Sequence, residues 1–408
     1  MTADDPKTIR RRKVLYIPGF DPFPPRRYRE LYRREGAEQA RLSGYALRLS
    51  AGSNVRSWQV DAQIEGVRTR TDFEVLVWSD LVAEGMSTSI LGTYATLLRT
   101  AWIYLRSGAI RRLMRLRKGP MIAVAYSTVV LILQLAFAGV IAVLAWWACA
   151  VMAGGYVGQA LGVAAGLVTG WVTLRWFKAR DNRILAHYLL HDYAYMARRK
   201  GAYPAGFETR LAAFADRVAA TCATDAEEVL VVGHSAGVHI GISVLADLIR
   251  ANRIPDNRCA FLSLGQVVPM VSFLPNAQRL RDDLHLMGGQ TLVPWVDVSA
   301  PGDGCTFALC DPVAISGQTP RVRTGPRILS AAFSRTLTPA KQKSLRRRFF
   351  RKHFQYLCAF DNLAGRPGEY DYFRVTAGPK RLADRFAGRE DSPSTLRDPD
   401  RRAARRAA

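Results

Sequence analysis

The sequence predicts an α/β fold in which a mostly parallel sheet carries helices on both faces and is interrupted by a two-helix transmembrane hairpin. Short runs of β-branched residues alternate with helical segments along the chain, a pattern typical of parallel sheets. One such run, 228–232, leads directly into Gly-His-Ser-Ala-Gly and then into an apolar helical segment. In addition, residues 119–174 contain no Asp, Glu, Lys, Arg or His. The first two observations predict the sheet and its helices, and the third predicts the hairpin.

The N-terminal part of the α/β domain is expected to span residues 1–118. The apolar content and periodicity of its segments predict both strands and helices. In chain order we expect a buried strand at 13–18, a charged helix at 27–43, short strands at 45–50 and 58–64, a strand at 72–78 and a largely helical, amphipathic stretch at 81–116.

The C-terminal part of the domain is expected to span residues 177–387. Its predicted elements are helices at 181–199 and 205–220, the strand that precedes the Gly-His-Ser-Ala-Gly turn, and two further strands at 258–264 and 292–298. Residues 388–408 are rich in Arg, Ala and Asp, so we expect them to form a disordered basic tail.

Residues 119–176 are predicted to form the hairpin. As one helix, the charge-free stretch would be roughly 84 Å long, whereas the hydrocarbon core of a bilayer is only ~30 Å thick. Two spans at about 121–147 and 156–176, joined by a turn at 153–155, fit this thickness better. A buried hairpin in a soluble protein is disfavoured, because helices that face water need a charged side.

The flanks of the hairpin predict its orientation. Basic residues precede and follow the spans: Arg111, Arg112, Arg115, Arg117 and Lys118 before them, and Arg175, Lys178, Arg180 and Arg183 after them. By the positive-inside rule both ends lie in the cytoplasm. Residues 1–12 are charged and lack the apolar region of a signal peptide. We therefore expect a protein of the cell (inner) membrane with two spans, and with both termini and the catalytic domain in the cytoplasm.

The formal net charge of +24 has two candidate explanations, nucleic acid and anionic lipid. Basic residues cluster beside the spans, at 341–352 and at 380–406. A chain embedded in a bilayer already lies beside anionic head groups, where each nearby cation contributes about 1 kcal/mol. No nucleic-acid fold signature is recognisable. The sequence therefore favours the bilayer and its anionic head groups as partners, and no nucleic acid.

The second span contains a glycine at every fourth position, so that these residues share one stripe of the helix: Gly158, Gly162, Gly166 and Gly170. Small residues at this spacing allow helix backbones to approach closely. Packing against the first span is the first interpretation, and a homodimer seam is the alternative. Residues 119–174 of the hairpin contain no Asp, Glu, Lys, Arg or His, which disfavours a transport pathway.

Ser235 lies at the centre of the Gly-x-Ser-x-Gly motif. The preceding strand and the following helix are the context in which a serine is held on a sharp, strained turn with its hydroxyl exposed above a sheet. Gly233 and Gly237 permit the tight turn and the close approach of helix to strand. The sequence therefore predicts that Ser235 is a nucleophile.

The chain resembles the α/β-hydrolase superfamily, particularly its lipase-like and esterase-like members. The resemblance rests on the segment 228–248, on 14–20 with its Ile-Pro-Gly-Phe motif, and on the strand at 292–298 with its acidic turn. It covers about half of the chain, and the hairpin is not part of the usual fold. It implies a catalytic triad in the chain order Ser, Asp or Glu, His, and no cofactor.

The resemblance implies a histidine base for Ser235, because a serine hydroxyl needs a base to accept its proton. His353 follows the last strands, where the family places its base, and His285 is the fallback. His187 and His191 are expected to pack in the core or at an interface, and His239 in the core. His234 lies within the turn itself and is expected to point away from Ser235. His187 and His191 are spaced i, i+4, but no third metal ligand accompanies them, so no metal site is predicted.

The acid of the triad should follow the strand at 292–298. Asp303 lies in a Pro-Gly-Asp-Gly turn at that point and is the first choice. Asp297 is the alternative acid, because a carboxylate within an apolar strand needs a buried partner. Asp311 is third. The acid would hold the imidazole in the correct tautomer and stabilise its charged form.

The resemblance also implies an oxyanion hole formed by two backbone N–H groups. The family takes one from the residue after the nucleophile, here Ala236. The other comes from the loop after an early strand, where the Phe20 N–H is the expected donor. The His-Gly pair that is common in this loop is replaced by Pro18-Gly19.

These features predict a membrane-anchored serine hydrolase that cleaves carboxylic esters, including those of lipids, through an acyl-enzyme on Ser235. The alternative is a catalytically inactive scaffold of the same fold that serves as a membrane interaction protein. A channel or transporter is disfavoured by the uncharged spans.

Overall fold

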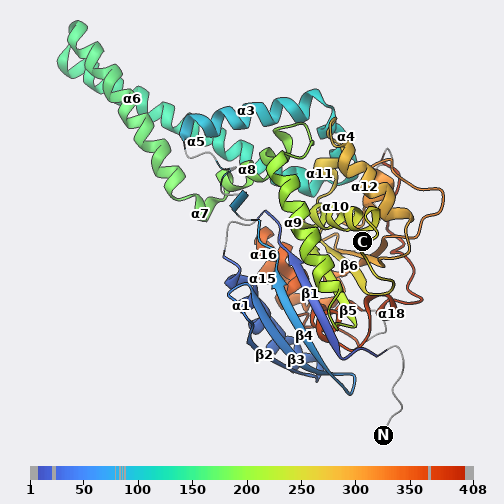
Figure 1. Ribbon diagram of the computed structural model, residues 1–408. Coiled ribbons are helices and arrows are strands. Elements are labelled where there is room, and N and C mark those ends of the chain that lie inside the picture. The colour runs from blue at the N-terminus through green and yellow to red at the C-terminus, as the bar shows by residue number, and fades with distance from the viewer. Residues whose placement is uncertain are drawn as a thin grey trace.

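A single mixed sheet forms the centre of the molecule (Figure 1). The computed structural model describes residues 8–20, 24–78, 80–81, 84, 86, 89–365 and 369–399. Within these residues the sheet has eight strands in the order β2-β3-β4-β1-β5-β6-β7-β8. The strands are β1 (Arg11–Ile17), β2 (Ala46–Ala51), β3 (Ser57–Ile64), β4 (Val67–Val75), β5 (Glu228–His234), β6 (Cys259–Leu264), β7 (Trp295–Ser299) and β8 (Arg327–Ser330).

The sheet is mostly parallel, as the sequence predicts. Strands β2, β3 and β4 form an antiparallel meander at one edge. From β4 onward every neighbouring pair is parallel. Strand β1 lies between β4 and β5, with Leu15 aligned to Glu74 on one side and to Val231 on the other. The segments before and after the hairpin therefore belong to one sheet.

Helices cover both faces of the sheet, so the central strands are buried on both sides. Every residue of β5 is buried, as expected for a parallel strand between two helical layers. One face packs against α9 (Ala205–Cys222), α10 (Gly237–Arg250) and α12 (Gln278–Gly289). The other packs against α1 (Arg26–Ser43), η1 (Phe354–Leu357), α17 (Tyr372–Ala377) and α18 (Leu382–Arg385).

A group of helices links the sheet to the hairpin. They are α3 (Ile90–Arg106), α4 (Ala109–Leu116), α7 (Asp181–Ile184), α8 (Ala186–Ala197) and α11 (Pro269–Ser272). The stretch expected to be helical at 81–116 is divided at Gly108, which has a left-handed φ of 68°. The remaining short helices are α13 (Pro312–Ile315), α14 (Phe333–Thr336), α15 (Pro339–Leu345) and α16 (Phe349–His353).

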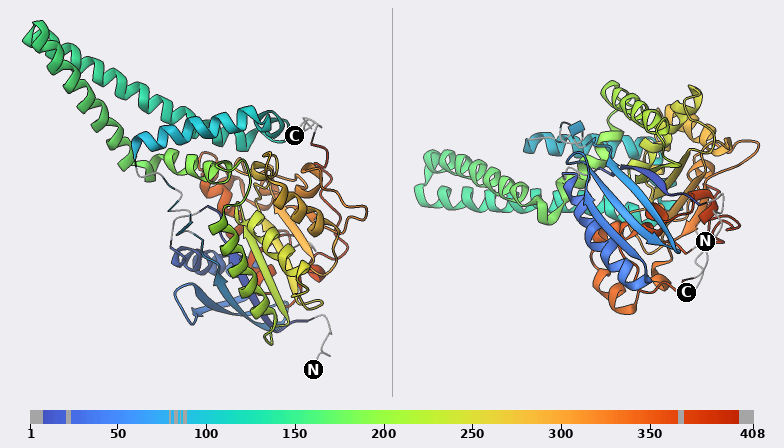
Figure 2. Two further views of the ribbon diagram at one scale, coloured as in Figure 1. Left: turned by 45° about the horizontal axis from the view of Figure 1, so that its top comes forward. Right: turned by 60° about the horizontal axis from the view of Figure 1, so that its bottom comes forward.

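Helices α5 (Lys118–Ala153) and α6 (Gly155–Ala179) form an antiparallel hairpin that projects from the body (Figures 1 and 2). The most apolar 18-residue windows of the two helices have mean hydropathies of 2.6 and 1.5, and both helices are long and apolar enough to span a membrane. Only 17% and 22% of their most apolar windows are buried. The apolar side chains therefore form an exposed surface and not the core of a soluble domain.

The glycine stripe of α6 faces α5 of the same chain. A Cβ atom on Gly162 would lie 2.6 Å from the carbonyl oxygen of Trp146, and one on Gly166 would lie 2.8 Å from that of Ala142. The first interpretation of the stripe, packing between the two spans, is therefore the one that the structure shows. A dimer seam on this face would require α5 to leave it.

Two features differ from the expectations drawn from the sequence. Strand β8 was not expected, because its four residues are too short to show a periodicity. The expectation of a disordered tail from residue 388 is wrong for residues 389–399. The backbone N–H of Leu396 bonds to Leu309, its carbonyl accepts from Asp311, and Ser392 bonds to Ile328. These bonds order the segment despite its polar composition, and residues 400–408 lie outside the described residues.

Candidate active site

Ser235 occupies a strained turn between β5 and α10. Its φ is 55°, in the left-handed region that non-glycine residues rarely adopt. Its backbone N–H donates to the carbonyl of Leu264 at the end of β6, at 2.9 Å. A Cβ on Gly237 would lie 2.2 Å from the carbonyl oxygen of Ile17, and one on Gly233 would lie 2.9 Å from that of Gly237. The two glycines are therefore required for the close approach of α10 to β1 and β5.

His353 and Asp303 form a buried pair beside this turn. His353 is the last residue of α16, and Asp303 lies in the loop after β7. Nδ1 of His353 is 2.7 Å from Oδ2 of Asp303. The hydroxyl of Tyr356 also donates to Oδ2, at 3.1 Å, and the N–H of Cys305 donates to Oδ1, at 2.9 Å. Asp303 thus has a partner at each oxygen and is held in one orientation.

The environment of Asp303 keeps it ionised. Burial raises the pKa of this carboxyl group. The electrostatic attraction of His353 and the hydrogen bonds from His353, Cys305 and Tyr356 together outweigh burial, so the pKa lies below its usual value. A carboxylate can only accept hydrogen bonds, so Nδ1 of His353 carries the proton of this bond. In the neutral imidazole Nε2 is then left as the basic nitrogen.

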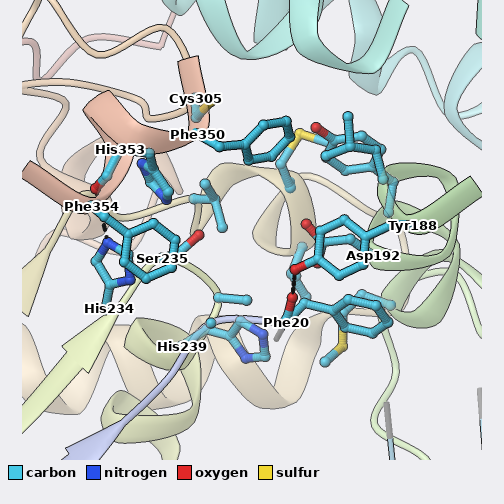
Figure 3. Close-up of a pocket in the computed structure, with 18 of the residues that line it drawn as sticks. Phe20, Tyr188, Asp192, His234, Ser235, His239, Cys305, Phe350, His353 and Phe354 are labelled. Atoms are coloured by element: carbon cyan, nitrogen blue, oxygen red, sulfur yellow. Dashed lines mark hydrogen bonds between the residues drawn. The ribbon is translucent and has the colours of Figure 1, made fainter. Parts of the chain in front are cut away.

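The imidazole of His353 and the hydroxyl of Ser235 line the same pocket (Figure 3). Glycines on each side leave room for them. A Cβ on Gly19 would lie 3.0 Å from Cβ of Ser235, and one on Gly265 would lie 3.2 Å from Cε1 of His353. The structure therefore places Ser235 and His353 in the wall of one pocket, with Asp303 hydrogen bonded to His353.

His234 supports this arrangement in a way that the sequence did not reveal. Its Nε2 lies 3.1 Å from the carbonyl oxygen of His353, and its ring is tilted by 36° to the imidazole of His353 at a centroid distance of 4.8 Å. Burial, followed by the nearby His353, lowers the pKa of His234 to about 3, so the ring is neutral. It acts as a hydrogen-bond donor that positions the backbone of His353.

The other candidate acids lie elsewhere. Asp297 is buried within β7, where Oδ1 accepts the hydroxyl proton of Ser263 at 2.6 Å, and burial raises its pKa to about 7. Asp311 caps α13 and pairs with Arg323. Neither is hydrogen bonded to His353, because Asp297 is turned toward Ser263 within the sheet and Asp311 lies at the start of α13 beside Arg323. Asp303 instead lies beyond the end of β7.

The other candidate histidines are also accounted for. His285 is exposed, and its Nδ1 lies 3.2 Å from the carbonyl of Gln318. His239 is buried, and its Nδ1 lies 3.2 Å from the hydroxyl of Tyr203. Nδ1 of His191 lies 2.7 Å from the carbonyl of His187. Among the described residues no cluster of His, Cys, Asp and Glu could hold a metal ion.

Phe20 and Ala236, whose N–H groups the sequence assigned to an oxyanion hole, both line the pocket with Ser235. Ala236 precedes the first residue of α10, so its N–H lies at the positive end of the helix dipole. The loop that carries Phe20 is held by Trp78, whose Nε1 donates to the carbonyl of Pro18 at 2.9 Å, and by Tyr188, whose hydroxyl donates to the carbonyl of Phe20. Among the described residues neither N–H donates to an acceptor of the protein, so both can serve a ligand.

The opposite wall of the pocket comes from helices that no motif indicated. Asp192 of α8 faces the pocket (Figure 3), and Tyr104 of α3, Tyr193 of α8 and Met270 of α11 also line it. Burial raises the pKa of Asp192 to about 7, against the opposing effect of His353. An acidic residue within the apolar and aromatic helix 186–197 is the one sequence signal that could have pointed to this wall.

No protein family, curated protein or solved structure was found to match this chain. The arrangement of its own residues therefore carries the functional argument. A hydroxyl on a strained turn, an imidazole oriented by a carboxylate and two adjacent N–H groups can together perform acyl transfer.

Proposed function

We propose that this protein is a membrane-anchored serine hydrolase of the α/β-hydrolase type that cleaves carboxylic esters through an acyl-enzyme on Ser235. The observation that carries the proposal is the buried His353–Asp303 pair beside a serine with a φ of 55°. Strain of this kind persists only where the surrounding structure enforces it, and it concentrates at functional sites.

In the first half-reaction Nε2 of His353 accepts the proton of Ser235, and Oγ attacks the carbonyl carbon of the ester. The N–H groups of Phe20 and Ala236 stabilise the resulting oxyanion, each contributing about 3 kcal/mol to lowering the barrier. When the tetrahedral intermediate collapses, the imidazolium donates its proton to the departing alkoxide, which leaves as the alcohol. Asp303 stabilises the imidazolium throughout this step.

In the second half-reaction a water molecule replaces the alcohol. His353 accepts a proton from the water, and the oxygen attacks the acyl carbon on Ser235. Collapse of this second intermediate releases the carboxylic acid, and the proton returns from His353 to Ser235. The residues of the site thus return to their starting protonation states.

The hairpin supports the membrane part of the proposal. Its apolar residues are exposed along most of α5 and α6, and basic residues precede the charge-free stretch 119–174 and follow it, at the two ends that join the body. We place the two spans in the cell membrane with the catalytic domain in the cytoplasm and its cations beside anionic head groups. The site lies on the body, close to the helices that carry the hairpin.

A fluorophosphonate probe tests the chemistry. The purified full-length protein in detergent is expected to be labelled in a manner that Ser235→Ala abolishes, whereas Ser334→Ala, which removes an exposed serine hydroxyl, leaves labelling unchanged. Thermal unfolding of each variant verifies that it is folded. If the folded wild-type protein is not labelled at Ser235, the chain is instead an inactive scaffold.

A further inference from the structure

A second cavity lies next to the candidate active site. It holds about 320 Å³ of free space, compared with about 90 Å³ in the pocket that contains Ser235. Its walls come from α3, α4, α5, α8 and α11. The smaller pocket has room for the reacting ester group. The larger cavity has room for a further part of a ligand.

The two cavities share part of their walls. Tyr104, Tyr193 and Met270 line both of them. The hydroxyl of Tyr104 donates to the backbone carbonyl of Met270 at 2.9 Å, which holds the tyrosine against α11. Because side chains change rotamer far more readily than helices move, rotation of these residues would join the cavities into one channel.

The lining of the second cavity suits a hydrocarbon chain. Of the described residues that line it none is charged, and most are Leu, Ile, Met, Val or Ala. Two of its hydroxyls are already used within α5, because Ser127 donates to the carbonyl of Val124 at 2.9 Å and Thr128 donates to the same carbonyl at 3.3 Å. Such walls stabilise apolar ligands by burying them and provide little to orient a polar one.

The rim of the cavity is continuous with the apolar surface of the protein. Three residues of its lining are strongly exposed: Leu105 is 63%, Met114 48% and Val129 52% exposed. Val129 belongs to α5, which continues from the cavity into the hairpin (Figure 1). An apolar ligand could therefore pass from the bilayer to the cavity without crossing water.

We infer that this cavity binds the acyl chain of the substrate, and that the substrate is a long-chain carboxylic ester of the membrane that enters laterally between α3, α4 and α5. The inference rests on the proposed function, since it places the ester carbonyl at Ser235. The helices that form the cavity walls would then determine chain-length specificity, whereas the triad and the oxyanion hole come from segments at the end of the sheet.

Filling the cavity tests the inference. Ala101 of α3 and Ala125 of α5 both line it, so Ala101→Trp and Ala125→Trp should block the chain. Leu98→Trp on α3 and Ile122→Trp on α5 are matched controls, because Leu98 and Ile122 are 72% and 64% exposed and lie outside the lining. We expect each filling variant to lower the ratio of hydrolysis of C16 to C4 esters by at least about tenfold, and the controls to leave this ratio unchanged.

A binding measurement separates this inference from the proposed chemistry. Ser235→Ala protein is incubated with a C16 alkyl ester that carries a photoreactive diazirine at the chain end. Crosslinks are expected on the cavity residues of α3 and α5 and are expected to be lost in the Ser235→Ala, Ala101→Trp double variant. Crosslinks confined to the exposed face of the hairpin, or unaffected by cavity filling, would overturn the acyl-site inference even if fluorophosphonate still labels Ser235. Specific cavity crosslinking without labelling of Ser235 would support the lipid site and overturn only the hydrolase proposal.

Discussion

Nδ1 of His353 lies 2.7 Å from Oδ2 of Asp303, and this bond joins a short helix near the C-terminus to the loop that follows β7. Both side chains are buried, with 8% and 0% of their side-chain surface exposed. The protein thus maintains a carboxylate and an imidazole together away from water. Burying two ionisable groups costs free energy unless they are hydrogen bonded to each other, as they are here. The position of this pair next to Ser235 therefore supports a role in the site.

Asp303→Asn should remove the group that orients and stabilises His353. We expect kcat for ester hydrolysis to fall by about 10⁴-fold, because the amide favours the wrong tautomer of the imidazole. Steady-state kinetics on a short soluble ester provide the measurement. Asp297→Asn is the matched control, since Asp297 is equally buried but bonds to Ser263, and it should change kcat by less than about threefold. Equal losses in both variants would contradict the assignment of the acid.

Gly237→Ala should disrupt the turn that carries Ser235. The added Cβ would lie 2.2 Å from the backbone oxygen of Ile17, and a backbone atom cannot move aside as a flexible side chain can. We expect a loss of stability of about 3 kcal/mol, measured as a lower Tm, together with loss of fluorophosphonate labelling. Gly206→Ala on α9 meets no atom within 4 Å and should leave Tm unchanged or slightly higher. A wild-type Tm for Gly237→Ala would show that the packing argument fails.

Asp192 should make the binding of apolar esters depend on pH. Burial raises its pKa to about 7, so the group is neutral below pH 7 and ionised above it. A negative charge in the pocket disfavours an apolar substrate, and we therefore expect KM to rise between pH 6.5 and 8.5. In Asp192→Asn the group cannot ionise, so this rise should disappear while kcat at pH 6.5 is retained. A KM profile of the variant that matches the wild type would exclude Asp192 as its origin.

Charges placed on the exposed face of the hairpin should weaken its insertion into a membrane. Leu144 and Val168 are 55% and 61% exposed on α5 and α6, and an arginine near the centre of a span costs about 3 kcal/mol. The double variant Leu144→Arg, Val168→Arg should therefore appear in the supernatant after alkaline carbonate extraction, whereas the wild type stays in the membrane pellet. Val55→Arg, at a 77% exposed position outside the hairpin, should behave as the wild type. Equal extraction of all three proteins would argue against the spanning arrangement.

The structure agrees with the sequence analysis most closely where the pattern is local. The strand, turn and helix around Ser235 are specified by 228–248, since β-branched residues favour the strand and the two glycines permit the turn. The hairpin could be predicted for a similar reason. Residues 119–174 contain no charged residue, and helices that face water need a charged side. The mostly parallel sheet could be predicted because short β-branched runs alternate with helical segments along the chain.

Other features depend on contacts between distant segments and could not be predicted. Asp297 and Asp303 both follow the pattern of a triad acid, and only the end of β7 determines that Asp303 reaches His353 while Asp297 is turned toward Ser263. The segment 389–399 has the composition of a disordered tail. It is ordered because its backbone pairs with Leu309, Asp311 and Ile328.

By itself, then, the chain specified an α/β body, a charge-free hairpin and a serine on a tight turn, because each depends on residues that are neighbours in sequence. The tertiary structure alone decided which carboxylate orients the imidazole, and which helices enclose the pocket. It placed Tyr104, Tyr193 and Met270 between two cavities, although they come from three separate helices. Such an arrangement follows from how the helices pack, and packing of this kind leaves no periodic trace in the sequence.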